Sequence, residues 1–343
     1  MKKLLWPVLA LILGGWMWTS CSNDFELTSE WKEIPVVYAI LSGDDAVHYV
    51  RVEKAFLDPE QSALLIAQNP DSIYYPANAI QVYLQKVGNP TLFQLTRVDG
   101  NLEGFKRDTG IFADSPNWLY KITAQEMGGF LEENATYRLI IKRADGQPDI
   151  TAETVIPRKP NLISPNNTGT PPKIQFMGQL TTLFRWTHDN NSAFFNVHLT
   201  VPYREVTPTG TIYDTIHWSP IQSLNAESTT ATSTLSRVAG NDFYTVVKNH
   251  IQTPNDGRTR YFGFISIEVE GGGKEIREYR ETALANAGLT GAEILQSYSN
   301  MSEGFGLFTA KNYVRYNGYK LWEESIDSMR LSPITRDLNF KFQ

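Results

Sequence analysis

Short segments in which apolar and polar residues alternate recur along most of the chain, and this period of two constrains the fold more than any other feature. Successive side chains of a β-strand point to opposite faces of a sheet, so alternation is typical of strands with one buried face. Helical patterns are expected only near residues 61–68, 242–250 and 282–297. The alternation occurs at residues 80–85, 137–142, 151–156, 195–201 and 265–270. The chain is therefore predicted to be mainly β.

A proline-rich segment divides this pattern into two parts. Residues 157–172, PRKPNLISPNNTGTPP, contain five prolines and little apolar periodicity, which predicts a linker at 158–172. Before it, residues 34–157 are expected to form an immunoglobulin-like antiparallel β-sandwich. After it, residues 173–343 are expected to form a second β-rich domain with short helical insertions. A chain of 343 residues is long enough for two such domains.

The single cysteine, Cys21, follows a short apolar run at the start of the chain. Lys2 and Lys3 precede residues 4–13, a run too short for a membrane span, so residues 1–20 are predicted to be a signal peptide. The small residues before the cysteine resemble the lipobox of bacterial lipoproteins, which makes Cys21 the predicted lipidation site for acyl chains such as palmitate. Buried methylenes of such chains contribute about 0.8 kcal/mol each to membrane binding. The alternative is a secreted protein with a free thiol.

The residues after Cys21 bear on location and partners. Ser22, rather than an aspartate, favours the outer membrane, and Asp24 and Glu26 resemble the acidic export tag of surface lipoproteins in Bacteroidota. Residues 21–33 would then form a lipidated polar tether. The formal net charge of −6 becomes −8 once Lys2 and Lys3 are removed, and the chain has no basic cluster. This charge excludes nucleic acid as an expected partner.

The sequence contains none of the common catalytic or nucleotide-binding motifs. We therefore predict no catalytic residue, no cofactor and no metal ligand. The pair His188 and Asp189 is expected to lie in a turn between strands rather than to form a catalytic dyad. Oxygen-rich residues 161–170 and 189–192 could bind calcium, although linkers and turns have the same composition. The histidines, at 48, 188, 198, 217 and 250, are not spaced as a local metal pair.

Tryptophans offer one further candidate site, a platform on which a sugar could stack. Two of them, Trp118 and Trp186, lie in alternating segments and are expected to pack in cores. The tryptophans that follow the predicted signal peptide are Trp31, Trp118, Trp186, Trp218 and Trp322.

The segment YSNMSEGFGLF, residues 298–308, places two glycines in a bulky apolar run, which predicts a turn or bulge leading into a buried strand. Here the chain resembles a Bacteroidota lipoprotein family known as domain of unknown function 4249. The resemblance also includes the lipobox and an early strand at residues 36–41. It implies a cell-envelope lipoprotein with an N-terminal β-sandwich, often encoded beside a TonB-dependent receptor, and it carries over no catalytic residue. The matching positions are Asn300, Gly304, Gly306 and Phe308.

Two functional classes follow from these observations. The first is a non-enzymatic accessory or ligand-capturing lipoprotein, anchored in the outer membrane and partnered with a TonB-dependent β-barrel receptor. The second is a surface glycan-binding module or hydrolase, whose site would be assembled from distant segments. Three short motifs also resemble the D-S/T-apolar acceptor for O-glycosylation in Bacteroidota, with acceptors Ser72, Thr215 and Ser328.

Overall fold

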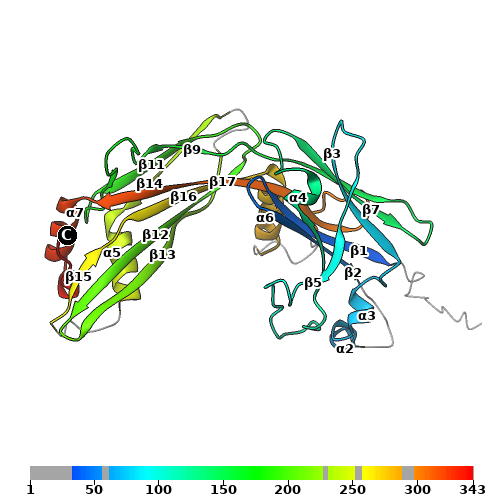
Figure 1. Cartoon of the computed structure of the whole chain (residues 1–343), viewed down its shortest axis with the longest axis horizontal. Helices are drawn as coiled ribbons and strands as arrows, with labels where there is room; N and C mark the ends of the chain where they lie inside the picture. The colour runs from blue at the N-terminus through cyan, green and yellow to red at the C-terminus, as the bar shows by residue number, and fades with distance from the viewer. Residues whose placement is uncertain (1–32, 56–61, 227–230, 252–256, 288–296, 343) are drawn as a thin grey trace, which may run out of the picture.

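The computed structural model describes residues 33–55, 62–226, 231–251, 257–287 and 297–342. These residues form two β-rich lobes joined into an arch (Figure 1). The predicted mainly-β architecture with two β-rich domains and a few short helices is confirmed. Each lobe has its own apolar core, because the alternating strands turn one face inward in each of them.

The N-terminal lobe is a sandwich of two sheets. One of its sheets has the order β4-β3-β7-β8, and the other contains β1, β2, β6 and β5. Val37, Val82 and Ile141 from the two sheets meet in its core, each essentially unexposed. The strands are β1 (Ile34–Ser42), β2 (Val47–Ala55), β3 (Ile80–Lys86), β4 (Phe93–Gln94), β5 (Thr96–Asp99), β6 (Trp118–Thr123), β7 (Thr136–Arg143) and β8 (Ile150–Val155).

The C-terminal lobe pairs a second small sheet, in the order β14-β11-β9, with long strands of the main sheet. Trp186, Phe195 and Phe243 are fully buried between these layers. The strands are β9 (Asn161–Ser164), β10 (Lys173–Ile174), β11 (Thr181–Thr187), β12 (Phe194–Thr207), β13 (Gly210–Asn225), β14 (Ser233–Ala239), β15 (Thr259–Phe262), β16 (Ile265–Gly272) and β17 (Phe305–Leu321).

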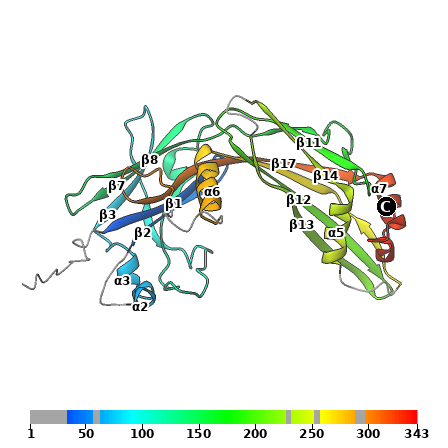
Figure 2. The ribbon, with the colours of Figure 1, turned by 180° about the vertical axis from the view of Figure 1, so that it is seen from behind.

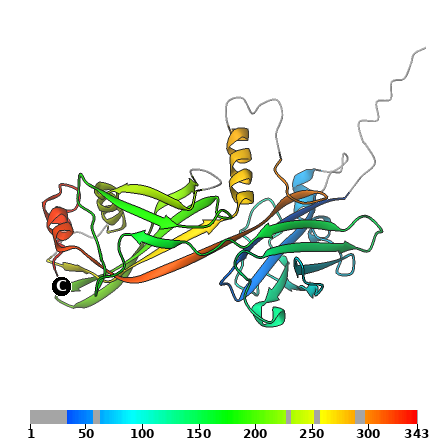
Figure 3. The same cartoon turned by 90° about the horizontal axis from the view of Figure 1, so that it is seen from above.

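Short helices lie at the edges of both lobes. α6 stands at the junction of the lobes and projects away from the sheet (Figure 3). α5 agrees with the helix predicted at 242–250, whereas α6 begins at Lys274, eight residues before the helix predicted at 282–297. The helices are α2 (Ala63–Ala67), α3 (Pro70–Ile73), α4 (Ala124–Met127), α5 (Gly240–His250), α6 (Lys274–Ala287), α7 (Glu323–Leu331) and the 3-10 helix η2 (Arg336–Leu338).

Strand β17 connects the two lobes within one continuous sheet. Among the described residues this sheet has ten strands: eight follow the path β13-β12-β16-β17-β1-β2-β6-β5, and β10 and β15 pair with β17 and β12 beside that path. The second half of β17 pairs antiparallel with β16, and its first half pairs parallel with β1, from Val36 opposite Phe305 to Ser42 opposite Lys311. Figure 3 shows β17 running from one lobe into the other. The sandwich predicted as antiparallel therefore contains one parallel pair among its described strands, because a C-terminal strand completes it.

The two cores do not correspond to two consecutive segments of the chain. Phe308 and Ala310 of β17 are buried in the core of the N-terminal lobe, although they lie within the range 173–343 expected for the second domain. Residues 161–164 of the predicted linker form strand β9, which pairs with β11. Leu162 there is buried in the C-terminal core. The alternation in this short strand is concealed by its flanking prolines, which explains why the segment resembles a linker.

Candidate functional site

A groove lies on the outer face of the main sheet in the C-terminal lobe. It has a volume of about 490 Å³ and crosses strands β12, β13, β16 and β17. Because side chains alternate along a strand, Val197 and Leu199 turn into the core while the residues between and beside them face outward. We call this surface the polar groove. It is lined by His198, Leu199, Thr200, His217, Trp218, Ser219, Ser266, Glu268, Arg315 and Asn317.

Neighbouring strands place four polar side chains of the groove in one row. His198 lies opposite Glu268, and Glu268 lies opposite Arg315. Nδ1 of His198 is 2.7 Å from Oγ of Ser219 on the other side. Arg315 donates from Nη2 and Nε to Oε2 of Glu268 at 2.6 and 3.0 Å. Each side chain of the row is thus oriented by its neighbour before any ligand arrives.

Such a row can hydrogen-bond a polar solute without first ordering its own side chains, which lowers the entropic cost of binding. The volume falls within the range of small-molecule sites, about 300 to 1,000 Å³. Glu268 is the one carboxylate among the described lining residues. Its pairing with Arg315 makes it a held hydrogen-bond acceptor. The groove therefore has the chemistry of a binding site for an uncharged polar molecule, such as a sugar.

The groove also brings together two histidines that are far apart in the sequence. Thr200 lies opposite His217, so His198 and His217 occupy neighbouring rows on adjacent strands. Within the described ranges, however, no cluster of three or more His, Cys, Asp or Glu side chains is arranged to hold a metal ion. The alternation in the sequence could have predicted that His198 and His217 face outward. Only the pairing of their strands shows that they lie close together.

A second candidate surface lies at the end of the N-terminal lobe. Helix α2 and the loop between β5 and β6 lie side by side there in Figures 1 and 2, and the amide of Ala113 donates to the carbonyl of Ala67 at 2.9 Å. Large apolar side chains project from both segments, and Leu102 is 87% exposed. We call this surface the apolar tip. Its exposed residues are Leu64, Leu65, Leu102, Phe105, Ile111 and Phe112.

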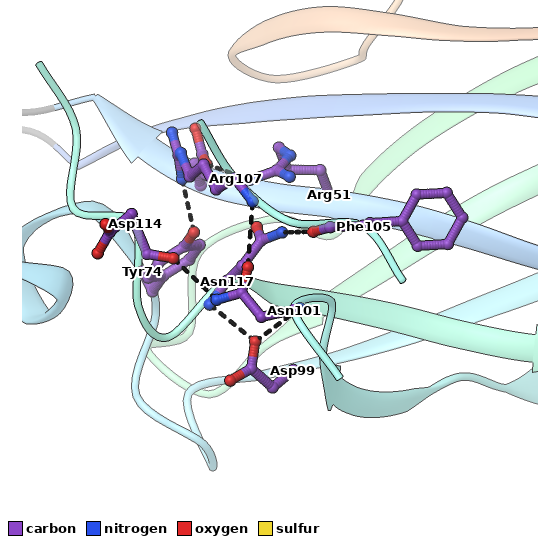
Figure 4. A network of polar contacts seen from close by, with 9 residues as sticks. Arg51, Tyr74, Asp99, Asn101, Phe105, Arg107, Asp114 and Asn117 are labelled. Atoms are coloured by element: carbon purple, nitrogen blue, oxygen red, sulfur yellow. Dashed lines mark hydrogen bonds and ion pairs between the residues drawn. The ribbon is translucent and has the colours of Figure 1, made fainter. Parts of the chain in front are cut away.

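Polar side-chain contacts fix the loop that carries most of the tip (Figure 4). Asn117, which is almost fully buried, donates from Nδ2 to the carbonyl of Phe105 at 2.7 Å. Oδ1 of Asp99 accepts from the amides of Asn101 and Asn117 at 3.0 and 3.1 Å. Asn101 in turn donates to the carbonyl of Asp114 at 2.8 Å. Side chains therefore supply hydrogen-bond partners to backbone amides and carbonyls of the loop, which has no neighbouring strand among the described residues to supply them.

Arg107 ties the same loop to the sandwich. Its Nη1 donates to the hydroxyl of Tyr74 at 2.6 Å and to Glu53 of β2 at 2.9 Å. Its guanidinium also lies over the ring of Phe112, 5.1 Å from the centroid. The ring of Phe105 packs edge-on against Tyr49 at 4.7 Å. The apolar side chains are thus presented from a fixed backbone, which is unusual for a surface loop.

The predicted modification sites fall in different parts of the molecule. Cys21 and its tether up to residue 32 lie outside the described residues. Ser72 lies in α3, Thr215 in β13 and Ser328 in α7. In all three motifs the aspartate is exposed, the acceptor is half-buried and the following apolar residue is buried. The apolar position of each motif therefore packs into the fold beneath a partly accessible hydroxyl.

The family-like motif forms the joint between β17 and β1. The side chain of Asn300 donates to the carbonyl of Phe308 at 2.7 Å and accepts from its amide at 2.9 Å. Gly304 and Gly306 have φ of +82° and +136°, and a Cβ at either position would lie 2.2 Å and 1.8 Å from the carbonyl oxygens of Pro35 and Val37, respectively. Only glycine fits so close an approach. The motif residues are assembled for this joint, and they are not part of the polar groove or the apolar tip.

His188 and Asp189 have structural partners. They lie in the connection between β11 and β12, as expected, but His188 is buried rather than hydrated, and its Nε2 is 2.9 Å from Oγ1 of Thr234. Asp189 accepts from the amides of Ser192 and Arg158 at 3.2 and 3.0 Å. Both carboxylate oxygens of Asp189 therefore accept hydrogen bonds from the backbone of the protein. Among the described residues, the segments 161–170 and 189–192 considered for calcium take part in no cluster of three or more His, Cys, Asp or Glu side chains.

The tryptophans do not form a common platform. Trp186 is fully buried, as predicted, and Trp218 packs partly buried against Phe176 and Phe243 beside the groove. Trp118, also expected in a core, belongs to neither core cluster; it is half-buried and lies beneath the guanidinium of Arg97 at 4.4 Å. Trp322 is 38% exposed on the C-terminal lobe, and Trp31 lies outside the described residues. Of the described tryptophans, Trp218 alone lines the polar groove.

Comparisons with known proteins leave the family open. No protein-family model matches the chain, and no curated protein matches it. The resemblance to domain of unknown function 4249 therefore stays a prediction. One structural match is the C-terminal globular domain of oligosaccharyltransferase from Pyrococcus abyssi, with 10% identity and a TM-score of 0.19. That match covers 81% of this chain and only 44% of the other, and at this TM-score no conclusion about fold or function follows from it. Among the described helices, none has the length and apolar content needed to cross a membrane.

Proposed function

We propose that this protein is a non-enzymatic lipoprotein of the outer membrane, anchored through Cys21, that works as the accessory of a TonB-dependent β-barrel receptor. The apolar tip is the observation that carries this proposal. Six large apolar side chains stand exposed on helix α2 and on the loop between β5 and β6, and side-chain hydrogen bonds hold the backbone of that loop. Large apolar side chains exposed on neighbouring segments are typical of protein interaction sites.

The position of the tip suits a partner in the same membrane. The described chain begins beside β2, where Ile34 pairs with Ala55, and α2 of the tip starts eight residues after Ala55. A tether of residues 21–33 spans roughly 40 Å when extended, at about 3.3 Å per residue. Anchoring to the membrane plane raises the effective concentration of both proteins, so a modest interface is sufficient.

Extraction from cells in mild detergent tests this proposal. We expect the wild type to be recovered with a TonB-dependent receptor and the double variant L65S/L102S to lose that receptor while remaining folded. Leu331, which is 83% exposed on the opposite lobe, provides the matched control, and Leu331→Ser should retain the receptor. Equal recovery with the tip variant and the wild type would exclude the tip as the docking surface.

The anchor is tested separately. Cys21→Ser should abolish labelling by a palmitate analogue and release the protein from membranes, because one thiol carries the predicted acyl chains. Membrane association of Cys21→Ser equal to that of the wild type would contradict the lipoprotein assignment without bearing on the tip.

A second candidate function, a surface glycan-binding module, is favoured by the polar groove. Its preorganised row of Ser219, His198, Glu268 and Arg315 suits the hydroxyl groups of a neutral sugar. A glycan-array screen of the purified protein tests it, with hits confirmed by calorimetry on Glu268→Gln. The control is Glu153→Gln, which alters a similar cross-strand pair with Arg138 on the other lobe. Sugar binding that both variants weaken equally would rule out the groove as its site.

A further inference from the structure

A pocket opens at the edge of the N-terminal sandwich, between its two sheets. It has a volume of about 610 Å³. Its walls come from β3 and β4 of one sheet and from β5 and β6 of the other, and Leu95 lies where the chain crosses between them. The pocket shares no lining residue with the polar groove or the apolar tip.

The inner part of this pocket is apolar. Ile80, Val82, Leu95 and Tyr120 line it, and each is at most 5% exposed and belongs to the core of the lobe. The outer part is polar and includes Arg97, Gln94 and Thr96 of the strands beside the opening. An apolar interior with a few polar groups near its entrance is typical of small-molecule sites.

Arg97 gives the pocket its charge. The residue lies opposite Tyr120 in the pairing of β5 with β6, so its side chain shares the inward face of the sheet. Its guanidinium stacks on Trp118 with 4.4 Å between Cζ and the ring centroid. This stacking holds the planar group in one orientation beside the apolar space.

The guanidinium is not neutralised within the described chain. Its Nε is buried and has no hydrogen-bond acceptor, and no described carboxylate forms an ion pair with Arg97. Arg260 differs in this respect, because it is fully buried and its Nε bonds Glu205 at 2.7 Å. The Nε atoms of Arg143 and Arg277 also lack a hydrogen-bond acceptor, but those two side chains form ion pairs with Asp145 and Glu281. Arg97 as a whole is half-buried, but a buried N–H donor without an acceptor is costly, and a carboxylate is the anion whose two oxygens match a guanidinium.

We propose that this pocket binds a small carboxylate with an apolar body, such as a short-chain fatty acid or an aromatic acid. The carboxylate pairs with the guanidinium of Arg97, and the hydrocarbon part occupies the space beside Val82, Leu95 and Tyr120. This binding site is independent of the proposed receptor and of the polar groove.

Calorimetric titration of the purified protein with hexanoate and with hexanamide tests the proposal. The two probes have the same hydrocarbon chain and differ in charge at the head. We expect hexanoate to bind at least tenfold more tightly, and raising the salt concentration to reduce that difference. Equal affinities, or no binding of hexanoate, would overturn the proposal on the wild type alone.

Two variants locate the binding. Arg97→Gln should remove the preference for hexanoate, whereas Arg204→Gln should keep it, because Arg204 stacks on Tyr261 in the other lobe in a similar way, at 5.0 Å. The indole resonance of Trp118 provides a readout that requires no variant, and it should shift when hexanoate binds and stay unchanged with hexanamide. A preference for hexanoate that Arg97→Gln retains would place the carboxylate elsewhere.

Discussion

The apolar tip and the polar groove differ in the surface that each exposes and in the interactions that support it. The tip exposes leucine, isoleucine and phenylalanine on a short helix and a loop, and the buried Asn117 with the half-buried Asp99 and Arg107 holds that loop in place. The groove exposes histidine, glutamate and arginine on strands, and an apolar core supports those strands. A loop needs side-chain hydrogen bonds because it has no strand partner, whereas strands satisfy their backbones and leave outward side chains free for a ligand.

The largest expected effect tests whether the two regions depend on each other through β17. Gly306→Ala places a Cβ 1.8 Å from the carbonyl oxygen of Val37, at a φ of +136°. We expect it to lower the free energy of unfolding by about 3 kcal/mol or more, since both the strain and the clash lie at the joint. Thermal unfolding monitored by circular dichroism measures this loss.

Gly318→Ala is the control for that variant, because Gly318 lies in the same strand with a φ of +87° but has open space around it. It should cost about 1 kcal/mol from backbone strain alone. Equal costs for the two glycine variants would mean that the close contact with β1 does not stabilise the joint.

The next effect separates the tip from the groove. Asn117→Ala removes the donor to the carbonyl of Phe105 and leaves that loop backbone without its partner. The expected cost is about 2 kcal/mol, confined to the N-terminal lobe. Hydrogen exchange should show faster exchange in residues 100–117 and unchanged protection of β12 and β16. Faster exchange in both lobes would show that the tip and the groove are not independently supported.

A substitution in the polar groove should affect ligand binding more than stability. Glu268→Gln breaks the ion pair with Arg315, whose side chain is 59% exposed, so the stability should change by less than about 1 kcal/mol. Any ligand of the groove should nevertheless bind more weakly. Chemical denaturation and calorimetry on the same variant measure both quantities. A large loss of stability would indicate that the row of polar residues supports the fold rather than a ligand.

The smallest expected effect concerns a buried acid at the junction. Burial raises the pKa of Glu275, which lies in α6 and accepts from the hydroxyls of Thr154 and Thr309 at 3.3 and 3.1 Å. Because its pKa is higher in the folded state, the folded protein holds this proton more tightly, and stability decreases as pH rises above about 4.5, the ordinary value.

Glu275→Gln should remove that dependence and make the protein slightly more stable near neutral pH than the wild type. Urea denaturation between pH 4 and 8 measures it, and Glu281→Gln on the same helix is the control. An unchanged slope of stability against pH in Glu275→Gln would contradict the assignment to this carboxyl group.

The strands and the turn chemistry could be predicted from the sequence because both depend on local spacing. Alternation at 80–85, 195–201 and 265–270 predicted β3, β12 and β16, since one buried face is enough to fix a strand. The glycines of residues 298–308 predicted a turn before a buried strand, which β17 is. The prediction of a lipid anchor at Cys21 rests on the same kind of local pattern.

Only the tertiary structure decided which distant residues meet. Phe308 completes the N-terminal core from the far end of the chain, because β17 pairs with β1 across more than 260 positions of sequence. His198, Glu268 and Arg315 form one row only through the register of three strands, and Arg97 meets Val82 and Leu95 in one pocket only because the edges of two sheets lie together. Periodicity fixes the face on which a side chain lies, whereas register and strand order are set by the packing of the whole molecule, and these decide its neighbours.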